Sequence, residues 1–367
     1  MKAYPLESIS VQQAMQKQFK IVECAMHHFE GSEFLTRGDL GVHQPENQPI
    51  TTMKAEKAIA EFFGAEDCIL VRGAGTGAIR YGLTSMIKAG QKMLVHDAAI
   101  YSTTVTTVEM LGLNIVKADY NDLNEIERVM NENPDIVCAL VQYTRQKLDD
   151  RYDMGEVLKK IKSCKDIPIL CDDNYAVLKV DKISCELGAD LSCFSTFKLQ
   201  GPEGIGCVVG KHEYIAKIRK MHYSGGCQTQ GWEALEVLRG LVYAPVMLTI
   251  AAETGEEVLK RINNGELEGV KQAYLANAQS KVLLVEFEQP IAKQVLVEAE
   301  KMGALPNPVG AESKYEFAPL FYRVSGTFLK TDPTLASRMI RINPNRAGAD
   351  TVMNILKKSV AAVTEVK

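Results

Sequence analysis

The sequence of 367 residues lacks several features that would assign it to a special class of protein. No apolar run approaches the length that a membrane-spanning helix needs, and the segment 1–19 lacks the apolar core and cleavage site of a signal peptide. Nine cysteines occur without a CxxC pair, and six histidines show no zinc-binding spacing. These absences predict a cytoplasmic protein with reduced thiols and no metal centre.

An excess of charge of one sign is also lacking. Lys and Arg number 42 against 46 Asp and Glu, which gives a net charge of −4. We therefore expect neither nucleic acid nor an anionic membrane as the main partner. The hydrophobic share of 46% and the charged share of 24% are typical of a globular protein, and the length suggests roughly two domains.

From Asp67 onward, short apolar runs alternate with helical patterns. This alternation predicts an α/β fold whose large domain has a mostly parallel seven-stranded sheet between helices. The expected strands are Cys68–Val71, Lys92–His96, Asn114–Ala118, Ile136–Gln142, Ile167–Asp172, Leu191–Thr196 and Cys207–Val209. Ligands of such sheets bind at the carboxyl ends of the strands.

Three parts are expected along the chain. Residues 1–50 form an N-terminal helix and arm, and the amphipathic helix either packs on its own core or clasps a second subunit. Residues 51–250 form the large domain, and residues 251–367 form a smaller C-terminal α/β domain. The long helical stretch Gly231–Asn263 connects the last two and is expected to break near Pro245.

The stretch Arg72–Arg80, RGAGTGAIR, is a glycine-rich turn between an expected strand and an expected helix. The backbone N–H groups of Gly75, Thr76 and Gly77 would open this helix and face a phosphate, and the Thr76 hydroxyl adds a donor. The motif therefore predicts a phosphate-binding turn.

The same turn admits a second interpretation. From Gly73 to Ala78 it fits the dinucleotide fingerprint GxGxxA, and Asp97 lies where a ribose-binding acid is expected. A nicotinamide-dependent dehydrogenase would explain this turn and Asp97.

A lysine follows an apolar strand in Leu191–Gly210, LSCFSTFKLQGPEGIGCVVG. A strand end followed by glycines can hold the Lys198 amine in a fixed pose with another molecule close by. Ser195 could donate its hydroxyl to the same phosphate, and Thr196 is a second candidate. The alternative is a solvated lysine at a strand end.

Another buried strand, in Ile167–Val177, ends in two acids. A strand-end acid is often a helix cap, but Asp172 could instead contact a pyridine nitrogen, and the Tyr175 phenol could hydrogen-bond the ring's hydroxyl oxygen. Either Tyr101 or His96 could stack on a planar ring. With the lysine and the phosphate turn, these residues predict pyridoxal phosphate held as a Schiff base on the lysine.

The C-terminal part offers a candidate for binding substrate. Arg341, in MIRINPNRAG, closes a short expected strand, and a guanidinium can bind a carboxylate through two parallel hydrogen bonds. Arg338 and Arg346 are neighbouring candidates, and a surface salt bridge is the alternative.

In this order, the motifs resemble those of fold-type I pyridoxal-phosphate enzymes, the aspartate aminotransferase superfamily. The stretch GAEDCILVRGAGTGAIRYGL is similar to cystathionine synthases and lyases and to class V aminotransferases, whereas FKLQGPEGIGCVVG resembles the selenocysteine synthase branch. The overall likeness is to a YhfS-like branch, and it covers about Thr36–Tyr243 well.

The resemblance implies roles for single residues. Lys198 would form the Schiff base and shuttle the substrate's α-proton, Asp172 would pair with the pyridinium, and Tyr101 would stack on the ring. Arg341 would bind a substrate carboxylate. The phosphate would be held by Gly75, Thr76, Gly77 and Ser195.

Two positions depart from the pattern of the family. Val141–Lys147, VQYTRQK, stands where many relatives carry a Glu/Asn-Pro motif, and Gln142 is a partial substitute. Phe197 precedes the lysine where many lyases have Thr. In relatives a second subunit completes the phosphate site, which implies a homodimer. The residues that the second subunit would contribute are Gly226, Gln228 and Thr229, or Arg37.

The resemblance thus implies a pyridoxal-phosphate enzyme that acts on a small-molecule amino acid, with an aminotransferase as the first expectation. A carbon–sulfur or other β/γ-elimination lyase is the second. A dehydrogenase would leave Asp172, Tyr175 and Lys198 without a role. A non-catalytic cofactor-binding homologue also remains open, since intact motifs do not establish activity.

Overall fold

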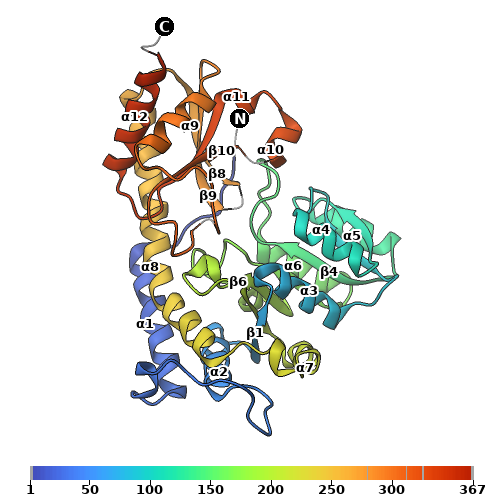
Figure 1. Ribbon diagram of the computed structural model, residues 1–367. Coiled ribbons are helices and arrows are strands. Elements are labelled where there is room, and N and C mark those ends of the chain that lie inside the picture. The colour runs from blue at the N-terminus through green and yellow to red at the C-terminus, as the bar shows by residue number, and fades with distance from the viewer. Residues whose placement is uncertain (1–2, 279, 311, 325, 365–367) are drawn as a thin grey trace.

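The computed structural model describes residues 3–278, 280–310, 312–324 and 326–364, and it contains two β-sheets (Figure 1). The strands of the larger sheet are β1 (Asp67–Arg72), β2 (Lys92–His96), β3 (Asn114–Ala118), β4 (Ile136–Gln142), β5 (Ile169–Asp172), β6 (Leu191–Ser195) and β7 (Ile205–Gly210). Their spatial order is β1-β7-β6-β5-β4-β2-β3. We call the part of the chain built on this sheet the large domain.

All seven expected strands are present, and the mostly parallel sheet is confirmed. The pairs from β3 through β2, β4 and β5 to β6 are parallel. Only β7 runs against its neighbours β1 and β6. An antiparallel neighbour can be reached through a short connection, whereas a parallel one needs a crossover. The connection between β6 and β7, residues 196–204, therefore stays at the carboxyl end of β6, and it carries Lys198.

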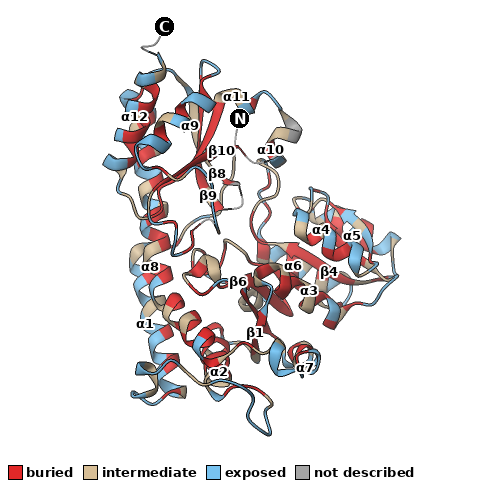
Figure 2. Ribbon diagram, viewed as in Figure 1, coloured by how far each residue is buried: buried red, intermediate tan, exposed pale blue. Residues whose placement is uncertain are grey.

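Helices cover both faces of the larger sheet, and its strands are largely buried between them, except for the edge strand β3, which is mostly exposed (Figure 2). On one face lie α3 (Ala74–Met86), α4 (Ser102–Met110) and α7 (His212–Met221). On the other lie α2 (Ile50–Phe63), α5 (Leu123–Glu132), α6 (Met154–Cys164) and α8 (Gly231–Arg261). The N-terminal α1 (Val11–His28) packs against α2 and α8. The 3₁₀ turns are η1 (Glu33–Leu35), η2 (Ser184–Leu187), η3 (Phe197–Leu199) and η4 (Gly225–Cys227).

Two expectations about α8 are wrong. The helix continues through the buried Pro245, because its packing against α1 and α2 compensates for the lost backbone hydrogen bond. The chain leaves helical geometry later, at Gly265 (φ 84°) in η5 (Ile262–Glu266). The span Gly225–Glu266 is also long and apolar enough to cross a membrane by length and composition alone. Because 56% of its most apolar window is buried inside the protein, this apolar character is that of a core helix.

The second sheet has four antiparallel strands in the order β10-β11-β9-β8. They are β8 (Val270–Ala278), β9 (Ser280–Phe287), β10 (Leu320–Arg323) and β11 (Met339–Asn343). The accompanying helices are α9 (Ala292–Lys301), α10 (Gly326–Thr331), α11 (Leu335–Arg338) and α12 (Ala349–Thr364). We call this part the small domain. The long α8 extends from the large domain to the small one (Figure 1).

Candidate active site

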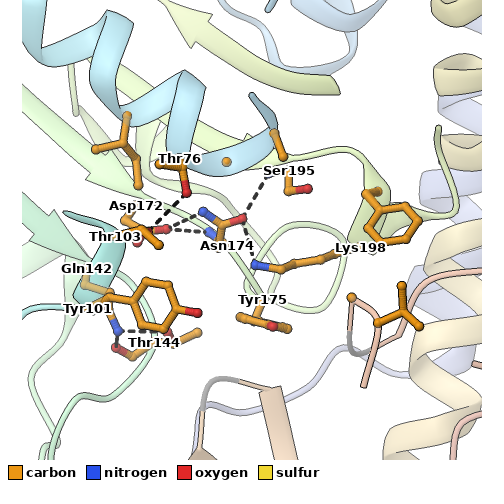
Figure 3. Close-up of a pocket in the computed structure, with 16 residues that line it drawn as sticks. Thr76, Tyr101, Thr103, Gln142, Thr144, Asp172, Asn174, Tyr175, Ser195 and Lys198 are labelled. Carbon is orange, nitrogen blue, oxygen red and sulfur yellow. Dashed lines mark hydrogen bonds between the residues drawn. The ribbon is translucent and has the colours of Figure 1, made fainter. Parts of the chain in front are cut away.

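The carboxyl ends of β4, β5 and β6 meet at one edge of the larger sheet, beside a cavity of about 220 Å³ (Figure 3). Each strand ends in a polar residue that lines this cavity: Gln142, Asp172 and Ser195. The strand register places Gln142 directly beside Asp172. Parallel strands therefore bring together side chains that are far apart in the sequence, as expected for a ligand site of an α/β sheet.

The glycine-rich turn forms one end of the cavity. Gly73 and Ala74 adopt left-handed backbone conformations (φ 96° and 53°), and both N–H groups donate to the Gly204 carbonyl, 2.8 and 3.0 Å away. Helix α3 then begins with Gly75 and Thr76 at the cavity. The first-turn N–H groups of a helix have no partner within it, so this end of the cavity attracts an anion.

A hydroxyl from a second helix joins this end of the cavity. The Thr76 hydroxyl lies 3.1 Å from the hydroxyl of Thr103 in the first turn of α4, and both residues line the cavity. Sequence reasoning missed Thr103, although it lies only two residues after Tyr101 in a hydroxyl-rich stretch. Helix starts of α3 and α4 thus converge on one site.

The structure corrects the role expected of Gly77. Its N–H donates to the Gly73 carbonyl at 2.8 Å, within α3, and Gly77 does not line the cavity. A Cβ atom at this position would lie 2.1 Å from the Arg72 carbonyl oxygen. Glycine is therefore needed here for close packing of the helix start on β1, and its amide is not available to a ligand.

Lys198 lies in the short connection after β6, within η3, with its amine beside the cavity (Figure 3). Its Nζ atom donates to Asn174 Oδ1 at 3.2 Å and lies 3.9 Å from the centroid of the Tyr175 ring. Burial lowers the pKa of the Lys198 amine to about 8, although Asp172 and Glu312 act against this shift. A larger share of the amine is therefore neutral, and so nucleophilic, near neutral pH than for an exposed lysine.

The two adjacent acids have separate environments. Asp172 borders the cavity, and burial raises the pKa of its carboxyl, while hydrogen bonds from Asn174 and the charge of Lys198 lower it. Asp173 faces the interior, where it accepts the Ser184 N–H at 3.0 Å and the Ser184 hydroxyl at 2.5 Å. Asp172 is thus the acid available to a ligand, as expected.

The aromatic candidates also separate. Tyr101 is 46% exposed and borders the cavity at the start of α4. His96 is buried away from the cavity lining: its ring lies 2.9 Å from Asp150 Oδ1, and its Nδ1 accepts the Tyr120 N–H at 3.1 Å. The ring of Tyr175 lies beside the Lys198 amine. The backbone of Tyr175 has a left-handed conformation (φ 65°).

The expected substrate arginine, Arg341, is not among the residues that line the cavity. Arg341 is buried in β11, its Nε donates to the Arg323 carbonyl at 2.8 Å, and its guanidinium lies 3.9 Å from the Tyr322 ring centroid. Its two competitors have other partners. Arg338 pairs with Glu286, and Arg346 donates to the Ser313 carbonyl.

Other candidates from the sequence make bonds within the chain. The Thr196 hydroxyl donates to the Ile205 carbonyl at 2.8 Å, and the Thr229 hydroxyl donates to the Leu70 carbonyl at 3.0 Å. Asp97, the candidate ribose-binding acid, pairs with Lys147 at 2.6 Å. Gln228 donates to the His222 carbonyl, whereas Gly226 and Arg37 are exposed.

Comparison with known proteins assigns the fold and the site to a class. The model of the class-V aminotransferase family matches residues 14–238, and that of the YhfS-like C-terminal domain matches residues 256–356. The chain therefore belongs to the class-V aminotransferase family, in its YhfS-like branch. The family expected from the sequence is confirmed.

A protein of Escherichia coli strain K12, described as "Uncharacterized protein YhfS", is 53% identical over 364 residues, which are 99% of this chain and 100% of that protein. The crystal structure of E. coli YhfS, described as a pyridoxal-5'-phosphate-dependent protein, superposes with a TM-score of 0.97 over 99% of this chain and 100% of its own. A cysteine desulfurase of Wigglesworthia glossinidia brevipalpis is 27% identical over 206 residues, 51% of this chain and 48% of that protein.

A more distant solved structure shares the fold. The cystathione gamma lyase CalE6 from Micromonospora echinospora has a TM-score of 0.70 at 16% identity, and the match covers 89% of this chain and 92% of that one. This likeness concerns the arrangement of the sheet, its helices and the C-terminal domain, and confirms the expected fold type.

Proposed function

We propose that the protein binds pyridoxal phosphate covalently at Lys198 and acts as an aminotransferase on an amino acid. The observation that carries this proposal is a half-buried lysine, Lys198, whose amine has a pKa lowered to about 8 by burial, in the same cavity as the buried Asp172 carboxylate and an anion-binding helix start. The cofactor class agrees with the family and with the 53% identical YhfS, whose structure is described as pyridoxal-5'-phosphate dependent.

The residues around the cavity fit this cofactor. The amine of Lys198 can bind its aldehyde carbon, and the Asp172 carboxylate can hold a proton on its pyridine nitrogen. Hydroxyls of Thr76, Thr103 and Ser195 and the first-turn N–H groups of α3 can hold its phosphate. A Cβ atom at residue 75 would lie 2.6 Å from Asn174 Oδ1, so glycine at this position leaves room for the Asn174 amide beside the cavity.

When bound, pyridoxal phosphate withdraws electrons from the α-carbon of an attached amino acid. The Lys198 Nζ, when not bonded to the cofactor, would take the substrate's α-proton and pass it to the cofactor carbon that had been the aldehyde carbon, which is where transamination needs it. Asp172 would keep the ring nitrogen protonated, and Tyr101, which lines the cavity, would stack on the ring. Arg341 stays the proposed receptor of the substrate's carboxylate, because a guanidinium can bind a carboxylate through two parallel hydrogen bonds.

An elimination lyase, which breaks a carbon–sulfur or similar bond, is the second candidate. The partial match to a cysteine desulfurase favours it. Both reactions use the same Lys198 and Asp172, so the difference lies in what leaves or is added after the α-proton has been removed.

We further propose that the enzyme is a homodimer. The outer surface of α1 exposes Met15, Phe19, Val22 and Met26, and Phe19 and Met26 are 53% and 64% exposed. Four apolar side chains exposed on one face of a single helix indicate a contact with a second copy of the chain. Arg37 and Trp232 lie together at a further cavity on this side of the molecule, so Arg37 is available to the partner.

The cofactor proposal is tested by reduction with borohydride. The purified protein should be yellow, and reduction should abolish its visible band and add a pyridoxyl mass to Lys198. Nicotinamide binding without that mass would contradict the proposal and favour a dehydrogenase.

The reaction type is tested by adding amino acids singly, with and without a keto acid. With an amino acid alone, an aminotransferase should change the visible band and release one equivalent of keto-acid product for each site, and added keto acid should restore the band and allow sustained turnover. Sustained release of pyruvate or ammonia without a keto acid would favour the lyase. A band that responds to none of the amino acids would favour a non-catalytic homologue.

A further inference from the structure

One polar side chain of the cavity, Asn174, was not anticipated from the sequence, and it lies between the groups with the clearest chemistry. It follows β5 by two residues and contacts Asp172, Ser195 and Lys198 (Figure 3). We propose that Asn174 is a positioning residue that fixes the Asp172 carboxylate and the Lys198 amine in the poses that the cofactor requires. This inference rests on the proposed function.

Toward Asp172, Asn174 acts as a double donor. Its backbone N–H and its side-chain Nδ2 donate to the same carboxylate oxygen, Oδ1, at 3.0 and 2.8 Å. Within the described part of the chain, no donor is recorded for the other oxygen, Oδ2. Two bonds to one oxygen fix the rotation of the carboxylate and leave the second oxygen for the cofactor. They also stabilise the ionised form, which burial opposes.

Toward the lysine, Asn174 acts as an acceptor. Its Oδ1 accepts the backbone N–H of Ser195 at 3.0 Å and Nζ of Lys198 at 3.2 Å. The Ser195 N–H can only donate, so it determines which end of the amide carries the oxygen. The Nδ2 end is then directed at Asp172, and one amide orients both reacting partners.

The position of the amide is itself constrained. A Cβ atom at residue 75 would lie 2.6–2.7 Å from the Asn174 amide oxygen and nitrogen, so glycine at 75 leaves the space that the amide fills. The next residue, Tyr175, has φ 65°, a left-handed backbone conformation that is strained for a residue other than glycine. Backbone strain next to Asn174 is typical of a segment whose geometry serves a site.

The first test measures Lys198 in the cofactor-free protein. Trace acetylation with acetic anhydride across a pH series, read by mass spectrometry at Lys198, gives the pH of half-maximal labelling. Asn174→Ala removes an acceptor of the charged amine, so this midpoint should fall by about half to one pH unit. Asn174→Asp keeps the acceptor and adds a negative charge, so the midpoint should rise by about one unit.

The second test measures Asp172 through the bound cofactor. Both Asn174→Asp and Asn174→Ala keep the backbone N–H donor to Asp172 but lose the side-chain donor, so both should retain the cofactor about tenfold less tightly in dialysis. In both variants kcat should fall while KM changes little, because the defect lies in the orientation of the reacting groups and not in the binding of the substrate.

A matched control exists in the same domain. Asn121 donates to Asp119 Oδ1 through its backbone N–H at 3.0 Å and its Nδ2 at 2.7 Å, the same Asp-x-Asn arrangement outside the cavity lining. Asn121→Ala should leave the Lys198 midpoint and cofactor retention unchanged, even if it lowers the melting temperature.

The outcomes separate this inference from the proposed function. If the native protein takes the pyridoxyl label at Lys198 but both Asn174 variants keep the native midpoint and retention, Asn174 is merely structural and the inference is wrong. If the native protein takes no label there, the proposed function fails, while the acetylation midpoints still report whether Asn174 controls the amine.

Discussion

The large domain and the small domain form the walls of the cavity in different ways. The large-domain wall consists of strand ends and helix starts, whose positions are fixed by the hydrogen bonds of the sheet. The small-domain wall consists of Val309 and Gly310, on the connection between α9 and β10. Val309 is 72% exposed. One wall carries the acid, the amine and the hydroxyls, and the other offers an apolar side chain and a glycine.

The loop that forms the small-domain wall is held by hydrogen bonds within itself and by an ion pair to the large domain. The Glu316 carboxylate accepts the N–H groups of Val309, Gly310 and Ser313 at 2.5, 2.8 and 2.9 Å, which closes the loop. The Glu312 carboxylate attaches this loop to the large domain, because it forms an ion pair with Lys179. The loop supplies neither the acid nor the amine of the cavity, so it is the wall where we expect substrate preference to vary. Its influence on the amine is indirect, because the Glu312 carboxylate opposes the lowering of the Lys198 pKa.

The largest effect is expected at the amine of the large-domain wall. Lys198→Ala should abolish covalent attachment and lower turnover by about 10⁴-fold, because it removes both the nucleophile and the proton carrier. Activity assays and borohydride labelling measure this. The companion variant Lys179→Met, which changes the other lysine near the Tyr175 ring, should keep the label on Lys198. A label that moves elsewhere in Lys179→Met would mean that the wrong amine was assigned.

The adjacent acids should separate activity from stability. Asp172→Asn should lower kcat by about 10²–10³-fold with a nearly native melting temperature, since it removes a charge at the reacting group. Asp173→Asn should instead cost about 1.5–3 kcal/mol of unfolding free energy, because it weakens buried hydrogen bonds from Ser184. Thermal melts and steady-state kinetics on both variants test this separation, and the reverse pattern would contradict the assignment.

The attachment of the small-domain wall can be broken at its buried ion pair. The Lys179 and Glu312 side chains are 12% and 8% exposed, so removing either partner should cost about 3–5 kcal/mol. Glu312→Gln or Lys179→Met should therefore lower the melting temperature, and the double variant should cost less than the sum of the two. Additive losses would show that the two side chains act independently.

The pH dependence of cofactor uptake follows from the lowered pKa of the amine. Below about 8 the Lys198 amine is mostly protonated and cannot attack, so attachment to the cofactor-free protein should slow by about tenfold for each unit of decrease. Above about 8 the rate should level off. A lysine at its ordinary pKa of 10.5 would instead keep accelerating, and stopped-flow measurement of the visible band distinguishes the two.

The parts of the site that follow strand ends could be predicted from the sequence. Lys198, Asp172 and Ser195 come after apolar runs, and a parallel sheet brings such ends to one edge. The sequence also indicates the glycine-rich turn, but it does not show at which residue α3 begins. Because α3 already includes Ala74, the Gly77 amide falls within the helix and is bonded to it.

The remaining parts depend on geometry that the sequence pattern does not contain. The contacts of Asn174 depend on the left-handed turn at Tyr175, which a tyrosine does not signal. Thr103 reaches Thr76 only because α3 and α4 pack together. Val309 and Gly310 reach the cavity through the docking of the two domains, more than a hundred residues after Lys198.

The smallest effect is expected where the small-domain wall touches the large one. A Cβ atom at Gly310 would lie 2.5 and 2.7 Å from two ring atoms of Phe197, the residue before Lys198. Gly310→Ala should therefore displace the loop or the ring, at a cost of about 1 kcal/mol, and raise KM several-fold while Lys198 still binds the cofactor. Gly348→Ala, where a Cβ atom meets nothing within 4 Å, is the matched control in the same domain. If Gly310→Ala slowed kcat and left KM unchanged, the loop would act on the amine itself, and the two walls would not be separable.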